Sequence, residues 1–112
     1  MSFLFCFDLN GILIWKSPNG KEFMGEGFSG TYPGARSTPT VVNDLVYATS
    51  GMGRIACFET ATGTEKWAVD IVSDFESSVP YFGYSESVLV DQEKVYCFPA
   101  GPTENTVALN RF

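Results

Sequence analysis

The 112-residue sequence contains no histidine and only three cysteines, at positions 6, 57 and 97. Histidine is the commonest metal ligand and the usual acid–base residue near neutral pH. The cysteines lack the Cys-x-x-Cys spacing of zinc sites, and their odd number leaves at least one free thiol in a single chain. We therefore predict no metal site, and no residue of this chain is predicted to be catalytic.

Positive charge is also scarce, with 7 Lys and Arg residues against 13 Asp and Glu residues and a formal net charge of −6. Nucleic-acid backbones and anionic membrane surfaces both select for Lys and Arg, so neither is an expected partner. No apolar segment is long enough to span a membrane, and the N-terminal segment lacks the features of a signal peptide. The residues themselves therefore indicate no compartment.

Apolar residues are plentiful, since 45% of the chain is hydrophobic and 15% is aromatic. This composition is sufficient for a packed core and argues against disorder. The 11 glycines and 6 prolines are scattered along the chain, as expected where many short elements are joined by tight turns.

The sequence repeats with a period of about fifty residues. Cys6-Phe7-Asp8 recurs 51 residues later as Cys57-Phe58-Glu59, and a further 51 residues later as Ala108-Leu109-Asn110. A Gly and then a Trp follow the first two copies. Upstream of the second and third copies, residues 34–42 align with residues 83–90, and a Val-Tyr pair follows each. The agreement of these landmarks indicates a true structural repeat.

Each repeat unit reads as a series of short strands. Residues 39–42, 45–49, 54–59 and 65–71 are rich in β-branched and aromatic residues, and turn signals separate them. One such turn, 51–53, has two glycines but no following helix, so it is not a phosphate-binding loop. Four strands in about fifty residues match one blade of a β-propeller. We predict an all-β fold of four-stranded antiparallel blades in an incomplete ring of two to three blades.

The repeat also predicts how the chain is divided. Residues 1–17 would end one blade, residues 34–72 would form a complete blade, and residues 83–112 would supply the first three strands of the next. The Gly-, Pro- and Ser-containing segments 18–33 and 73–82 would connect the blades. Such a division predicts a fragment of a longer protein.

The segment 57–67, Cys-Phe-Glu-Thr-Ala-Thr-Gly-Thr-Glu-Lys-Trp, resembles the tryptophan-docking motif of pyrroloquinoline-quinone-type propellers. That motif reads Ala-x-Asp-x-x-Thr-Gly-x-x-x-Trp, so Thr62, Gly63 and Trp67 match it. The copy with Gly11 and Trp15 is one residue shorter in its turn. A glycine suits a positive-φ turn, and a Trp face can pack between blades while its indole N–H binds a backbone acceptor. We predict a structural role in blade docking for these five residues.

The resemblance implies two functions. Quinoprotein dehydrogenases of this family hold the quinone between a Trp and a disulfide of adjacent cysteines, beside a bound Ca²⁺. This chain has no adjacent cysteines, and its two Trp residues stand in docking motifs. We predict a non-catalytic scaffold or ligand-binding module without a cofactor, because fold alone does not confer function. The alternative is part of a quinone- and calcium-dependent alcohol or sugar dehydrogenase whose catalytic residues lie outside this chain. Relatives are usually exported, which implies a periplasmic or extracellular location.

Any ligand site is expected at the mouth of the propeller channel, where the first strand of each blade begins. The candidates there are Arg36, Ser37, Tyr84, Ser85 and Glu86. Arg36 could bind a carboxylate or phosphate and Tyr84 could stack on a sugar or peptide. Alternatively, Arg36 and Glu86 form an ion pair between blades and Tyr84 fills the channel.

The expected partners are the remaining blades of a longer protein or other copies of this chain, together with a protein, peptide or glycan ligand. Alone, the chain would expose open sheet edges and the apolar faces where blades meet. We expect the isolated chain to associate or to be poorly stable.

Overall fold

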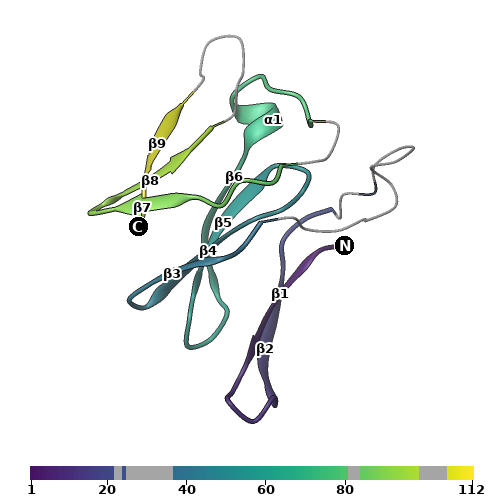
Figure 1. Ribbon diagram of the computed structural model, residues 1–112, viewed down its shortest axis with the longest axis vertical. Coiled ribbons are helices and arrows are strands. Elements are labelled where there is room, and N and C mark those ends of the chain that lie inside the picture. Colours follow the sequence, from purple (N-terminus) through teal and green to yellow (C-terminus); the bar gives the residue numbers. More distant parts are fainter. Residues whose placement is uncertain (22–23, 25–36, 81–83, 99–105) are drawn as a thin grey trace.

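The computed structural model describes residues 1–21, 24, 37–80, 84–98 and 106–112. Within them it contains nine strands, arranged in three antiparallel sheets, and one short helix (Figure 1). The first sheet consists of β1 (Phe3–Phe7) and β2 (Leu13–Pro18). The second consists of β3 (Thr40–Val42), β4 (Leu45–Thr49), β5 (Arg54–Glu59) and β6 (Glu65–Asp70), followed by α1 (Ile71–Asp74). The third consists of β7 (Leu89–Asp91), β8 (Lys94–Cys97) and β9 (Val107–Asn110).

In each sheet the strands are paired in their order along the chain. This meander of short antiparallel strands confirms the predicted all-β fold of partial propeller blades. The predicted strands 45–49 and 54–59 have the same limits in the structure. The predicted strand 65–71 ends one residue early, because the Asp70 side chain accepts the backbone N–H groups of Val72 and Ser73 and so begins α1.

The three sheets repeat one another in detail. The two-residue turns between β3 and β4 and between β7 and β8 place Asn43 and Gln92 at the same positive φ of 55°. The pairing of β1 with β2 shifts register after Cys6, and the pairing of β5 with β6 shifts after Cys57. The sequence repeat is therefore matched by a repeat of backbone conformation.

The four-stranded sheet lies between the other two sheets and is covered on both faces. Every residue of β4 is buried. Because successive side chains of a strand point to opposite faces, β4 and β5 contribute to two separate clusters. One cluster contains Tyr47 and Cys57 and extends to the third sheet, and the other contains Val46 and Phe58 and extends to Leu4 and Trp15 of the first sheet.

The outward face of the first sheet is not covered by described residues. Phe3, Phe5 and Phe7 occupy alternate positions of β1 and are 39%, 50% and 56% exposed, respectively. No helix in the described part of the chain is long and apolar enough to cross a membrane. The predicted blade limits, 1–17, 34–72 and 83–112, stay a prediction, since residues 25–36 and 81–83 lie outside the described residues.

Candidate functional site

The first sheet is attached to the second through Trp15 of β2. Its indole Nε1 donates a hydrogen bond of 2.8 Å to the carbonyl oxygen of Thr60. Two residues further along β2, the Ser17 hydroxyl donates a 2.5 Å hydrogen bond to the carbonyl oxygen of Gly63. Residues 60–63, the turn between β5 and β6, are called the docking turn below. The Trp15 indole N–H and the Ser17 hydroxyl thus both bind the backbone of this turn.

Gly63 is required where the indole rests on the docking turn. Its φ is +76°, and a β-carbon added there would lie 2.5 Å from Cε3 of Trp15 and 2.7 Å from the Ser17 hydroxyl oxygen. Both the backbone conformation and the close approach of the ring therefore select glycine.

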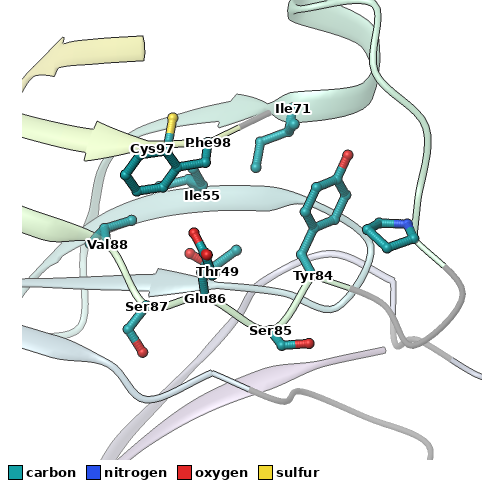
Figure 2. Close-up of a pocket in the computed structure, with 11 residues that line it drawn as sticks. Thr49, Ile55, Ile71, Tyr84, Ser85, Glu86, Ser87, Val88, Cys97 and Phe98 are labelled. Atoms are coloured by element: carbon teal, nitrogen blue, oxygen red, sulfur yellow. The ribbon is translucent and has the colours of Figure 1, made fainter. Parts of the chain in front are cut away.

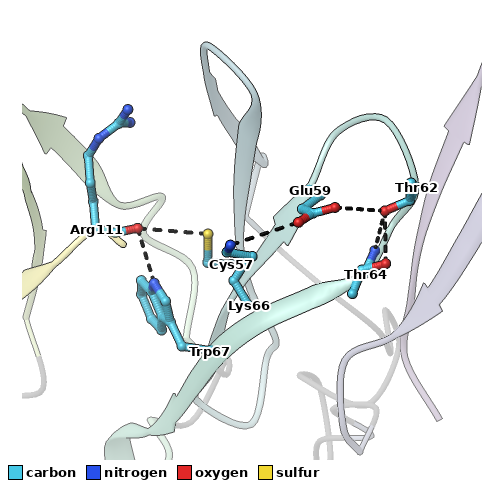
Figure 3. A network of polar contacts seen from close by, with 7 residues as sticks. All are labelled: Cys57, Glu59, Thr62, Thr64, Lys66, Trp67 and Arg111. Atoms are coloured by element: carbon cyan, nitrogen blue, oxygen red, sulfur yellow. Dashed lines mark hydrogen bonds and ion pairs between the residues drawn. The ribbon is translucent and has the colours of Figure 1, made fainter.

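The same interaction joins the second sheet to the third, as Figure 3 shows. Trp67 Nε1 donates to the carbonyl oxygen of Arg111 at 3.1 Å, and the indole lies 6.0 Å from the ring of Tyr47. The Tyr47 hydroxyl donates to that same Arg111 oxygen at 3.1 Å. Arg111 stands 51 residues after Thr60, so the acceptor carbonyls repeat with the period of the sequence.

Thr62 stabilises the docking turn from within. Its hydroxyl donates to the Glu59 carboxylate at 3.1 Å and accepts the backbone N–H of Thr64 at 3.2 Å (Figure 3). Lys66 Nζ lies 3.8 Å from the other Glu59 oxygen. Thr62 thus holds the docking turn in place through its hydrogen bonds to Glu59 and Thr64.

The corresponding turn of the first sheet is one residue shorter, although its glycine has a similar positive φ, and no indole lies on it. Gly11 has a φ of +80°, and a β-carbon added there would meet no heavy atom within 4 Å. The Asp8 carboxylate accepts the backbone N–H groups of Asn10 and Ile12 and so holds the turn. Leu9, which stands 51 residues before Thr60, is fully exposed.

All three cysteines are free thiols. Cys57 lies in the interface between the second and third sheets and donates a weak 3.9 Å hydrogen bond to the Arg111 carbonyl oxygen. Burial raises the pKa values of the Cys57 thiol, the Cys97 thiol and the Tyr47 hydroxyl above their ordinary values. These groups are protonated at neutral pH and belong to the packing of the interface.

A cavity of about 380 Å³ lies between the second and third sheets (Figure 2). Its buried lining includes the apolar residues Ile55, Ile71, Val88 and Cys97, whose exposed fractions are 0 to 8%. Thr49, Pro80, Tyr84, Ser85, Glu86, Ser87 and Phe98 complete the lining.

Three of the five predicted channel-mouth residues, Tyr84, Ser85 and Glu86, line this pocket. Ser37 lies beside it, because its hydroxyl donates to the carbonyl oxygen of Thr49 at 2.8 Å. Arg36 lies outside the described residues. Their suggested roles in ligand binding therefore stay predictions.

Tyr84 forms a fixed wall of the pocket. Its hydroxyl donates to the Ser78 carbonyl oxygen at 3.0 Å and shares a 2.8 Å hydrogen bond with the Ser77 hydroxyl. Its ring lies against Gly53, where an added β-carbon would be 2.8 Å away. These supports could not be predicted from the sequence, apart from the position of Gly53 in a tight turn.

Three sheets, successively joined by an indole N–H that binds a backbone carbonyl of the next sheet, define a β-propeller of the tryptophan-docking type. A family model described as outer membrane protein assembly factor BamB matches residues 4–110. The chain belongs to this family of pyrroloquinoline-quinone-type repeats, which confirms the resemblance seen in the sequence.

Among solved structures, the crystal structure of BamB from Moraxella catarrhalis is similar, with a TM-score of 0.57 and 25% sequence identity. The match covers 90% of this chain and 26% of that one, so this chain spans about a quarter of the length of the similar protein. A comparison with curated proteins gives no significant match.

Proposed function

We propose that this chain is a segment of a non-catalytic β-propeller that acts as a scaffold and binds other proteins. The observation that carries the proposal is the use of both tryptophans in the same structural way. The indole N–H groups of Trp15 and Trp67 each bind a backbone carbonyl of the following sheet. The repeat motif of this chain thus serves assembly of the propeller.

The proposed module works without a cofactor. A quinone site of the family's dehydrogenase type needs a Trp face and a disulfide of adjacent cysteines. The two Trp residues are engaged in docking, and Cys6, Cys57 and Cys97 are free thiols far apart in the sequence. These positions support a structural role for the residues that a quinone would otherwise use.

The first sheet supplies a docking surface for a further blade. Its outward face carries the exposed side chains of Phe3, Phe5 and Phe7, and Gly11 has a positive φ close to that of Gly63, on which an indole rests. We propose that a preceding blade of a longer protein, ending in Trp, occupies this face. A second copy of this chain would use the same face in the absence of such a blade.

The proposed partners are proteins of outer-membrane assembly, and the proposed location is the periplasmic side of the outer membrane. The support is membership of a family described as an outer membrane protein assembly factor, together with the similarity to BamB. The whole protein would present its partners with surfaces fixed by rigidly docked blades.

Cofactor addition tests the non-catalytic part of the proposal. The full chain is titrated with pyrroloquinoline quinone and Ca²⁺ while tryptophan emission is recorded, and dye reduction is assayed with alcohols and sugars. We expect neither saturable quenching at micromolar quinone nor turnover. Saturable binding with turnover would support the dehydrogenase alternative instead.

Removal of the protein from cells that produce it tests the assembly role. The expected result is a lower amount of folded outer-membrane β-barrel proteins, measured from their heat-modifiable mobility on gels. The full-length protein with Thr60→Ala is expected to restore that amount, since the acceptor at this position is a backbone carbonyl. The variant with Gly63→Val, which obstructs blade docking, is expected not to restore it. Unchanged levels of folded barrel proteins after removal would contradict the assembly role.

A further inference from the structure

Among the described residues that line the pocket between the second and third sheets, one, Glu86, has a charged side chain. Along residues 84–88 alternate side chains point to opposite sides, as Figure 2 shows. Tyr84, Glu86 and Val88 point toward the pocket, whereas the hydroxyls of Ser85 and Ser87 point away from it. Tyr84 and Val88 are each 8% exposed, whereas Glu86 between them is exposed, so its carboxylate is accessible from solvent.

The Glu86 carboxylate makes no hydrogen bond or ion pair with another residue in the described part of the chain. Two other glutamates there have cationic partners, since Glu65 pairs with Arg54 at 2.6 Å and Glu59 with Lys66 at 3.8 Å. None of the described residues that line the pocket is basic. Among the described residues, Glu86 therefore has no cationic partner, and its carboxylate can pair with a cation that enters from outside.

The remainder of the pocket is suited to an apolar group. Ile55, Ile71 and Cys97 form a buried lining, and the hydroxyl of Tyr84 is directed to Ser77 and Ser78. A cavity of about 380 Å³ is at the lower end of the size range of ligand pockets. It therefore has room for one bulky side chain rather than for a large cofactor.

We propose that this pocket binds a peptide segment in which a bulky apolar side chain stands next to a Lys or Arg. The apolar side chain enters the cavity, and the neighbouring cation pairs with Glu86. The net charge of −6 favours such a basic segment over an acidic one. This assignment deepens the proposed protein-binding function and rests on it.

Three synthetic peptides test the proposal by calorimetric titration of the full chain. Each is blocked at both ends and has glycines around a central pair: Phe-Lys, Phe-Glu or Gly-Lys. We expect the Phe-Lys peptide to bind about tenfold more tightly than either of the others, which corresponds to about 1.4 kcal/mol. Equal affinity for Phe-Lys and Phe-Glu would overturn the role of the cation, and equal affinity for Phe-Lys and Gly-Lys that of the apolar group.

Two charge variants locate the effect. Glu86→Gln is expected to reduce the preference for Phe-Lys over Phe-Glu to about twofold or less, because the paired carboxylate is lost. Glu93→Gln removes the same charge from an exposed turn and is expected to keep the preference. A preference that survives in Glu86→Gln would overturn the assignment of Glu86.

Failure of the pocket assignment can be distinguished from failure of the proposed scaffold function. Methyl chemical shifts of Thr49 and Val88, which line the pocket, are followed during the titration, while tryptophan emission reports whether the sheets stay docked. Absence of binding with unchanged emission would overturn the pocket assignment alone. The scaffold role would still be judged from the outer-membrane proteins of depleted cells.

Discussion

The indole Nε1 of Trp15 and the carbonyl oxygen of Thr60 form a 2.8 Å hydrogen bond that joins residues 45 positions apart. Trp67 and the carbonyl oxygen of Arg111 repeat it at the next interface. The acceptor is a backbone atom in both cases, so a threonine and an arginine serve equally. This explains why the repeat constrains the Trp and the turn glycine but leaves the acceptor position variable.

Replacement of Trp15 by Phe removes that hydrogen bond together with part of the ring. A smaller aromatic face is kept while the N–H is lost, so we expect the free energy of unfolding to fall by at least about 1 kcal/mol. The measurement is a urea titration followed by far-ultraviolet circular dichroism. Thr60→Ala leaves the acceptor carbonyl in place and should cost less than about 0.5 kcal/mol. An equal cost for the two variants would contradict the backbone-acceptor explanation.

Gly63→Ala and Gly11→Ala form a matched pair, because the two glycines have nearly the same φ of +76° and +80°. The Gly11 variant should lose about 1–2 kcal/mol of stability from backbone strain alone. The Gly63 variant should lose more, about 3 kcal/mol or above, because the new methyl group also displaces the indole of Trp15. Thermal denaturation of the two variants provides the comparison. Equal losses would show that the close contact at Gly63 adds nothing to the strain.

The sequence could predict the elements whose signals are local. Strands 45–49 and 54–59 were predicted with the observed limits, since one two-residue turn and two glycine-containing turns bound them. The end of β6 was wrong by one residue, because the predicted strand 65–71 ignored the ability of Asp70 to cap a helix. Local side-chain chemistry, rather than strand propensity, determined that boundary.

The site could be predicted only in part. The spacing of the motif revealed Gly63 and Trp67, but not their backbone partners, because a carbonyl 44 residues away leaves no mark in the sequence. The pocket was missed for a related reason. Its lining combines Ile55 of one sheet with Cys97 of the next, and no local pattern brings these residues together.

The stability of the chain should decline in alkaline solution. Burial raises the pKa values of Cys57, Cys97 and Tyr47 in the folded state, so the unfolded chain releases their protons first. Stability is then fully present below the thiol pKa of the unfolded chain, about 8.5, and is lost as the pH rises toward the folded values. Each thiol should contribute a slope of up to about 1.4 kcal/mol per pH unit.

Urea titrations between pH 7 and pH 10 in the presence of a reducing agent measure this decline. The double variant Cys57→Ala and Cys97→Ala should be less stable at pH 7, because two buried side chains are truncated. Its stability should nevertheless fall less steeply above pH 8.5. An unchanged slope would show that the two thiols do not control the alkaline behaviour.

Association in solution should depend on the exposed face of the first sheet. The rings of Phe5 and Phe7 stack at 6.1 Å between centroids, and both side chains are at least half exposed. Contiguous exposed aromatic surface of this kind favours association of copies when no other blade covers it. Sedimentation velocity of the full chain should therefore show species larger than a monomer.

Phe5→Glu should shift the population toward the monomer, because a carboxylate would then be buried without a partner. Val41→Glu places the same charge on an exposed residue of β3, away from this face, and should leave the association unchanged. A sharp monomer peak for the unmodified chain, or an equal response of the two variants, would contradict the docking role of the Phe3, Phe5 and Phe7 face.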